Sequence, residues 1–166
     1  MRPRGDTEEL RRREAELRDF FEQGAVALHW VGPDGRILWA NQVELDLLGY
    51  AAEEYVGRHI ADFHADPGII EDILQRLTGY ETLREYEARL RCRDGTIKYV
   101  LISSNVLREG DRFAHTRCFT VDITARKLAE RRLAVQYAIT RILADAPTLA
   151  AAAGPMLETI CEMLDW

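Results

Sequence analysis

The most informative part of this chain is residues 85–96, which read EYEARLRCRDGT. Apolar and charged residues alternate from 85 to 93, and a period of two is typical of a strand with one buried and one solvated face. The pair Asp94-Gly95 favours a tight hairpin, because both residues tolerate the backbone angles of a chain reversal. The apolar run Tyr99–Ile102 follows at once. This part therefore predicts two antiparallel strands.

Two further turn sequences extend the hairpin into a small sheet. Gly32-Pro33-Asp34-Gly35 separates apolar runs at 26–31 and 36–40, and Glu109-Gly110-Asp111 precedes a last strand over 112–123. Short turns of this kind join antiparallel neighbours. The pattern therefore predicts a small sheet of five strands in which the strands joined by these turns are antiparallel.

Helices are predicted between the second and third strands. Asn41 is expected to cap a short helix that ends at Gly49, with Glu44 completing a capping box. Residues 52–65 show only fragments of helical pattern and predict short turns. Asp66 precedes a helix over Pro67–Gly79 that has one apolar face.

Longer helical patterns occupy both ends of the chain. An amphipathic helix is predicted over 1–24 and a coiled-coil-like linker helix over 125–146, where apolar residues recur every seven positions. These predicted stripes comprise Leu10, Leu17, Phe21, Leu128, Val135 and Ile142. Residues 99–102 are apolar in succession, which predicts a cover on both sheet faces, and the terminal helices are the available cover. A further apolar pattern from 147 runs to Trp166, so we expect the natural protein to continue.

Composition excludes several classes of function. The chain has 166 residues and a formal net charge of −6, which argues against a nucleic-acid partner. No apolar run approaches the ~20 residues that cross a bilayer, so no membrane insertion is expected. The three cysteines lack metal-type spacing and indicate reduced thiols in a cytoplasmic protein.

Five motifs carry a resemblance to a known family. They are Gly32–Asn41, Leu48-Gly49-Tyr50, Glu54–Gly57, Arg93–Thr96 and Asp122-Ile123-Thr124. In this order they resemble the PAS domain of bacterial sensory proteins, in particular those of the sensor histidine kinase type. The segment 147–166 is similar to the opening helix of a GAF domain.

The resemblance implies an α+β PAS fold over 25–124, with a five-stranded antiparallel sheet and short helices on one face. It implies a sensory and dimerisation module that forms a homodimer and signals to a kinase or cyclase output domain in the same chain. The alternative is a constitutive dimerisation scaffold without a small-molecule ligand. The fragment itself is not expected to be an enzyme, because it lacks a Ser/His/Asp set, a phosphate-binding glycine loop and paired catalytic carboxylates.

Strand alternation within this fold places a set of side chains toward a ligand pocket. The candidates are Phe63, Ile73, Leu77, Tyr86, Ala88, Leu90, Val100, Ile102, Ser104, Thr116, Cys118 and Thr120. The alternative is that the same residues only fill the core. Asp122 and Thr124 are the expected signal-transmission junction, and the alternative there is an ordinary strand-to-helix cap.

No cofactor and no metal are expected, and haem or non-covalent flavin are the alternatives. Haem-binding members of the family place their ligand on the long helix, and His64 is the nearest histidine to it. Covalent flavin chemistry needs a cysteine that the matching segment Gly57–Phe63 lacks. His29 is expected on the outer face of the sheet, and Cys118 is expected to be an inert buried thiol.

Overall fold

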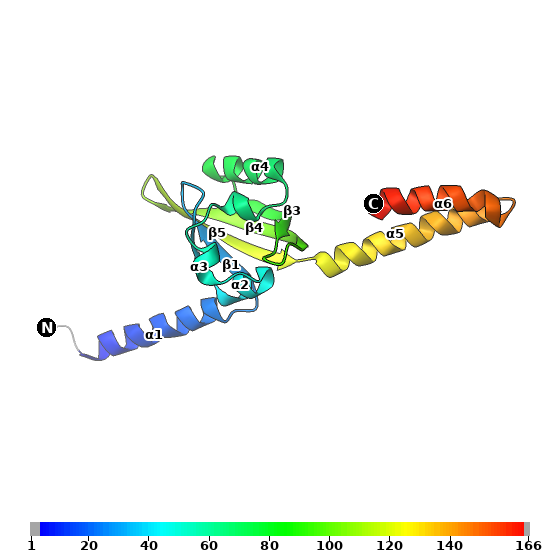
Figure 1. Ribbon diagram of the computed structural model, residues 1–166. Coiled ribbons are helices and arrows are strands. Elements are labelled where there is room, and N and C mark those ends of the chain that lie inside the picture. Colours follow the sequence, from blue (N-terminus) through cyan, green and yellow to red (C-terminus); the bar gives the residue numbers. More distant parts are fainter. Residues whose placement is uncertain (1–3, 165–166) are drawn as a thin grey trace. The chain divides into compact units, whose positions relative to one another are not determined.

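The computed structural model describes the backbone of residues 4–164 and the side-chain environments of residues 8–163. The chain divides after Asp122 into two compact units. The first unit contains α1 (Arg4–Glu22), β1 (Ala27–Val31), β2 (Ile37–Ala40), α2 (Gln42–Leu48), α3 (Ala52–Tyr55), the 3-10 helix η1 (Ile60–Phe63), α4 (Pro67–Thr78), β3 (Leu83–Arg91), β4 (Ile97–Glu109) and β5 (Arg112–Asp122). The second unit contains α5 (Thr124–Asp145) and α6 (Leu149–Leu164) (Figure 1).

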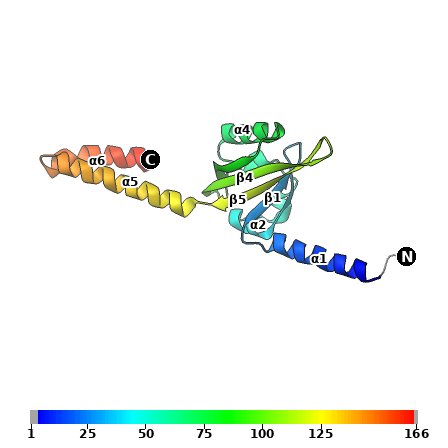
Figure 2. The ribbon, with the colours of Figure 1, turned by 180° about the vertical axis from the view of Figure 1, so that it is seen from behind.

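The five strands form one sheet in the order β2-β1-β5-β4-β3, and every neighbouring pair is antiparallel. This confirms the sheet predicted from the turns. Figure 2 labels three of these strands, β1, β5 and β4. The turn glycines Gly35, Gly95 and Gly110 have φ angles of 76°, 85° and 63°. A residue with a Cβ is strained at such positive φ angles, so glycine at these positions permits each chain reversal.

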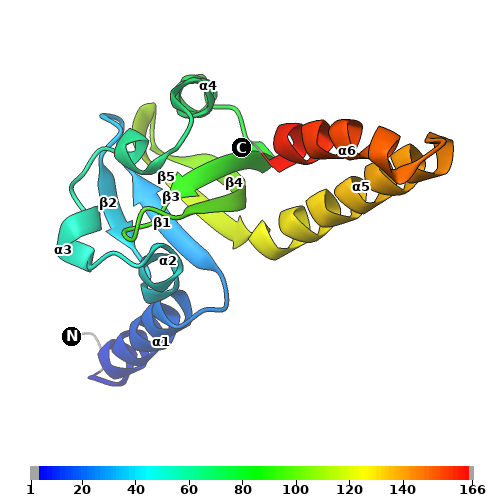
Figure 3. The same cartoon turned by 45° about the vertical axis from the view of Figure 1, so that its right-hand side comes forward.

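The helices α2, α3 and α4 lie on the same face of the sheet, with α4 over β3 and β4 (Figure 3). Their apolar faces enter one buried cluster with the inner side of the sheet. Its members are Val31, Ile37, Ala40, Leu45, Leu48, Tyr55, Ile60, Phe63, Ile70, Ile73, Leu77, Leu83, Ala88, Leu90, Cys92, Val100 and Ile102. The helix predicted after Asp66 begins at Pro67, although the Asp66 carboxylate bonds Arg89 on β3 instead of capping the helix.

The outer face of the sheet is only partly covered. Trp30, Phe119 and Val121 are 38%, 41% and 49% exposed, and Tyr99 and Leu101 on β4 are half-buried. The prediction that β4 is covered on both faces is therefore only half right. The described side chains of α1 up to residue 20 are all exposed, so this helix does not supply the missing cover.

The second unit is a helical hairpin in which α6 packs against α5. Ala152 is buried, Val135 and Ile142 are half-buried, and Leu128 is exposed. Arg131 donates a hydrogen bond to the backbone oxygen of Met163. No helix within residues 4–164 is long and apolar enough to cross a membrane.

Candidate functional site in the sheet core

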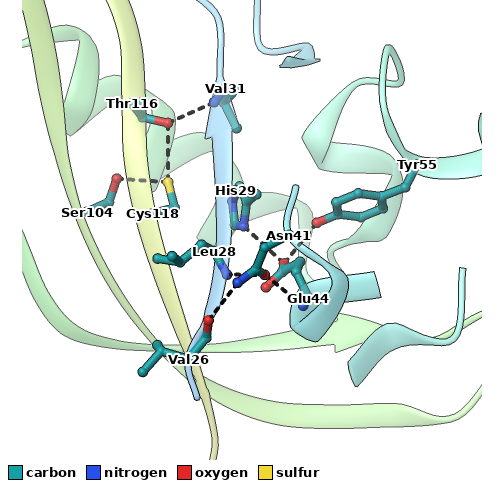
Figure 4. A network of polar contacts seen from close by, with 10 residues as sticks. All are labelled: Val26, Leu28, His29, Val31, Asn41, Glu44, Tyr55, Ser104, Thr116 and Cys118. Atoms are coloured by element: carbon teal, nitrogen blue, oxygen red, sulfur yellow. Dashed lines mark hydrogen bonds and ion pairs between the residues drawn. The ribbon is translucent and has the colours of Figure 1, made fainter. Parts of the chain in front are cut away.

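A buried polar cluster occupies the inner face of the sheet beneath α2 and α3 (Figure 4). Its centre is His29 on β1, which is 4% exposed. The expected position of His29 on the outer face was wrong. Ala27 and Val31 point inward with His29, while Leu28 and Trp30 point outward. The core can hold the imidazole because it contains a polar partner for it.

Glu44 on α2 is that partner. Its Oε1 lies 3.0 Å from His29 Nδ1, and it accepts a hydrogen bond of 3.0 Å from the Tyr55 hydroxyl. The predicted capping box is therefore only half right: Asn41 caps the helix, but the Glu44 carboxylate turns into the core instead of reaching back to the backbone. The arrangement joins β1, α2 and α3 through one fully buried carboxylate.

The charges of this pair stabilise each other. Burial lowers the pKa of His29, but the facing Cys118 and Glu44 outweigh it and hold that pKa well above its usual value. Burial likewise raises the pKa of Glu44, yet His29 and the hydroxyl of Tyr55 lower it below its usual range. Burial next to Glu44 raises the pKa of Tyr55. The cluster thus holds an imidazolium and a carboxylate inside the core at neutral pH.

Cys118 lies directly opposite His29 across the β1–β5 ladder. Its Sγ is 2.9 Å from Ser104 Oγ and 3.2 Å from Thr116 Oγ1 (Figure 4). Burial raises the pKa of the thiol, but His29 and the two hydroxyl contacts outweigh it and hold the pKa below its usual value. The sequence-based expectation of an inert thiol overlooked this environment, because it placed His29 on the other face.

Asn41 anchors the cluster to the end of α1. Its Oδ1 accepts hydrogen bonds from the backbone nitrogens of Leu28 and Glu44, at 2.9 and 3.0 Å. Its Nδ2 donates to the backbone oxygens of Phe21 and Val26, both at 2.9 Å (the Val26 bond is drawn in Figure 4). One buried amide therefore links the N-terminal helix, β1 and the start of α2.

Several buried polar atoms near the cluster have no hydrogen-bond partner among the described residues. They include Glu44 Oε2, Thr120 Oγ1 and His64 Nδ1. Burial, reinforced by the positive charge of His29, lowers the pKa of His64 to about 4. His64 is therefore a neutral imidazole at neutral pH.

The predicted pocket residues fall into two groups. Phe63, Ile73, Leu77, Ala88, Leu90, Val100 and Ile102 belong to the apolar cluster, while Tyr86 is half-buried and its hydroxyl donates to Asp72 at 2.6 Å. Ser104, Thr116, Cys118 and Thr120 form the polar part of the same face. A cavity of about 250 Å³ adjoins this face, and its lining includes Leu77 and Thr116.

The predicted junction residues lie where the two units meet in the sequence. Asp122 pairs with Lys98 on β4 at 2.9 Å. Thr124 is the first residue of α5, and Ile123 occupies the N-cap position.

The comparison with known families decides the assignment. A PAS domain family model matches residues 24–125. The chain belongs to the PAS domain family. This confirms the resemblance carried by the five motifs.

Individual relatives agree with this PAS assignment. The chain is 29% identical over 136 residues to the C4-dicarboxylate transport sensor protein DctS of Rhodobacter capsulatus, a match that covers 79% of this chain and 21% of DctS. The chain thus spans about a fifth of that relative's length. The PAS domain of an HTR-like protein from Haloarcula marismortui superimposes with a TM-score of 0.63 at 22% identity, covering 73% of this chain and all of that one. The LOV domain of a blue-light activated histidine kinase from Erythrobacter litoralis EL346 gives 0.54 at 18% identity, covering 60% and 97%.

The residues of this PAS domain do not fit a covalently reacting flavin, because Gly57–Phe63 contains no cysteine. Within the part of the chain that the structure describes, no three His, Cys, Asp or Glu side chains are grouped to hold a metal ion. His64, the histidine considered for haem, lies just before α4 and bridges to Leu90 on β3.

Proposed function

We propose that this PAS domain is the sensory and dimerisation module of a cytoplasmic signalling protein. A ligand or partner at the core displaces the sheet, and α5 carries the change to an output domain in the same chain. A sensor histidine kinase is the proposed full-length protein, in keeping with the DctS match, and a cyclase output is the alternative.

The buried His29–Glu44–Tyr55 cluster is the observation that carries this proposal. A buried ion pair adds little to stability compared with apolar residues of similar size. Groups with strongly shifted pKa values gather at functional sites. A constitutive scaffold needs only a packed core. The charged cluster therefore favours the alternative in which the core responds to a ligand or partner.

The junction at the end of β5 provides the route for the signal. Lys98 on β4 holds the Asp122 carboxylate, and α5 begins two residues later at Thr124. Movement of β4 or β5 at this point therefore reaches the first turn of α5 through the backbone.

Coupling can be tested by hydrogen exchange on the 166-residue chain. Replacing Glu44 by Gln removes the buried charge, and we expect changed exchange protection in residues 124–145 as well as around the cluster. Glu54→Gln is the matched control, because this glutamate forms an exposed pair with Arg93. A change confined to the core of the Glu44 variant would favour the constitutive scaffold instead.

The exposed outer face of the sheet supports the homodimer. Trp30, Phe119 and Val121 present apolar surface that a second subunit can bury. Sedimentation of the chain at micromolar concentration should give a dimer, and Val121→Glu should shift it toward monomer. A wild-type chain that stays monomeric at this concentration would contradict the dimerisation part of the proposal.

The ligand itself is tested by native mass spectrometry of the purified chain. A bound small molecule that is lost after substitution of Ser104 or Thr116 supports sensing. Non-covalent flavin or haem would also appear as visible absorption. A chain that carries no added mass and shows no response to Glu44→Gln supports the scaffold.

A further inference from the structure

The groups around Cys118 form the arrangement of an activated thiol. The sulfur faces His29 across the ladder, and His29 Nδ1 lies 3.0 Å from the Glu44 carboxylate. Tyr55 holds the carboxylate by a further hydrogen bond. A cysteine beside a cationic histidine that a carboxylate holds in place is an arrangement that activates nucleophilic cysteines, because the positive charge stabilises the thiolate.

Two hydroxyls complete the surroundings of the sulfur. Ser104 Oγ and Thr116 Oγ1 both contact Sγ. Thr116 Oγ1 already accepts a hydrogen bond of 3.1 Å from the Val31 backbone nitrogen, so its own proton is available to the sulfur. Hydroxyl donors to sulfur favour the thiolate over the thiol.

The position of the sulfur limits what can react with it. Cys118 is 4% exposed, but Thr116 also lines the cavity of about 250 Å³, together with Val31 and Leu77. One side chain therefore separates the sulfur from a space that admits a small molecule.

We propose that Cys118 is a peroxide-reactive thiol, which hydrogen peroxide converts to a sulfenic acid inside the PAS core. The inference deepens the proposed function by naming a stimulus, but the chemical step does not depend on dimerisation or on the output domain. Reversible oxidation would alter the hydrogen bonds of a buried residue that links β5 to β1 and β4.

The reaction balances with the groups present and the peroxide. The thiol proton leaves to solvent, the His29 imidazolium stabilises the resulting thiolate, and the thiolate attacks one peroxide oxygen. An S–O bond forms, the O–O bond breaks, and its electron pair leaves with the second oxygen. That oxygen takes the proton from the His29 imidazolium and departs as water. Sulfur loses two electrons, and the peroxide gains them.

The other two cysteines are built-in controls. Cys92 is buried, and its sulfur contacts the Leu47 backbone oxygen at 4.0 Å. Cys161 on α6 is exposed. Access alone would favour Cys161, whereas the arrangement of groups favours Cys118.

The test treats the reduced 166-residue chain with hydrogen peroxide, traps sulfenic acid with dimedone, and measures the label on each cysteine peptide by mass spectrometry. We expect Cys118 to be labelled faster than Cys92, because His29 and the two hydroxyls favour the thiolate of Cys118. Glu44→Gln and His29→Gln should slow the labelling of Cys118 and leave the labelling rate of Cys161 unchanged.

A second variant keeps the test decisive if the charged-pair variants do not fold. Ser104→Ala removes one hydroxyl from the sulfur without removing a charge, and it should slow labelling of Cys118 only. Labelling of Cys161 alone in the wild type, or rates at Cys118 that none of the folded variants changes, would overturn the inference. If α5 still responds to Glu44→Gln, the sensory proposal stands without the thiol.

Discussion

The inner face of the sheet has two halves that differ in chemistry. Beneath α4, β3 and β4 present Leu90, Val100 and Ile102 to Ile73 and Leu77, and the packing is apolar. Beneath α2 and α3, β1 and β5 present a histidine, a cysteine and threonines to a buried glutamate. One half of the sheet therefore stabilises the fold by apolar packing. The other half contains buried charges, each of which needs an opposite charge beside it.

The two halves depend on different free-energy terms. Apolar packing adds stability in proportion to the area removed from water, and it tolerates exchange among residues of similar volume. Removing one member of a buried ion pair is strongly destabilising, whereas replacing both members by apolar residues of similar volume changes stability little. Substitutions that break one polar partner should therefore reveal the difference between the halves most clearly.

The largest expected effect is at Glu44. Glu44→Ala leaves the His29 imidazolium without a counter-charge and the Tyr55 hydroxyl without its acceptor, which should lower the free energy of unfolding by about 3–5 kcal/mol. Urea denaturation followed by circular dichroism measures it. Replacing both partners, His29→Leu with Glu44→Met, should restore most of the loss. A double variant as unstable as the single one would show that the polar half is not governed by its ion pair.

His64 tests the boundary between the halves, because it pairs with Leu90 of the apolar half through a backbone bridge and is influenced by the charges of His29 and Glu44 of the polar half. Its pKa is lowered to about 4 in the folded chain, against about 6.5 when unfolded. The folded state therefore disfavours protonation of the His64 imidazole. The stability from this group is complete above pH 6.5 and is lost as the pH falls toward 4, a change of about 3 kcal/mol.

The measurement is the free energy of unfolding of wild type and His64→Leu at pH values from 7 to 4. The difference between the two isolates His64 from the other titrating groups. The wild type should lose more stability on acidification than the variant. Parallel curves would show that His64 takes up its proton without cost and that the boundary is open to water.

The apolar half was largely predictable from the sequence, and the polar half was not. Alternation in β3 identified Ala88 and Leu90 as inward residues, as observed. In the polar half, alternation in β5 identified Thr116 and Cys118 as inward but gave no sign of the charged pair. The β1 phase was misjudged, because Leu28 and Trp30 are more apolar than His29. Local hydropathy cannot show that a glutamate 15 residues further on supplies the compensating charge.

A weaker signal for the polar half was present in β5. Its inward positions Thr116, Cys118 and Thr120 are all small and polar, which indicates a polar neighbour on the adjoining strand. Ala27 and Val31 give the matching phase of β1. Glu44 was assigned to a capping box because the Asn41 spacing fits one, and only its tertiary partners reveal the other use. The ligand pocket, the junction and the domain boundaries stay predictions.

Asn41 extends the polar half toward α1, and it should be costlier to lose than an amide elsewhere on the sheet. Asn41→Ala removes a helix cap and leaves the groups that its side chain bonds without partners, which should cost about 2–3 kcal/mol. Exchange protection at the end of α1 should fall with it. Asn105→Ala is the matched control, because this half-buried amide has its oxygen on Arg117 and should change stability by less than about 1 kcal/mol. Equal losses would mean that Asn41 is not the link between α1 and the core.

The smallest effect comes from removing one hydroxyl in each half. Tyr55→Phe takes the donor from the buried Glu44 carboxylate, while Tyr86→Phe takes a 2.6 Å hydrogen bond from the half-exposed Asp72. Water can replace the lost donor at Asp72 but not at Glu44, so we expect about 1–2 kcal/mol for Tyr55 and below about 0.5 kcal/mol for Tyr86. Urea denaturation of the two variants under the same conditions measures the difference. Similar small values would mean that water reaches Glu44. The carboxylate would then need no protein donor, and the contrast between the halves would reflect composition and not burial.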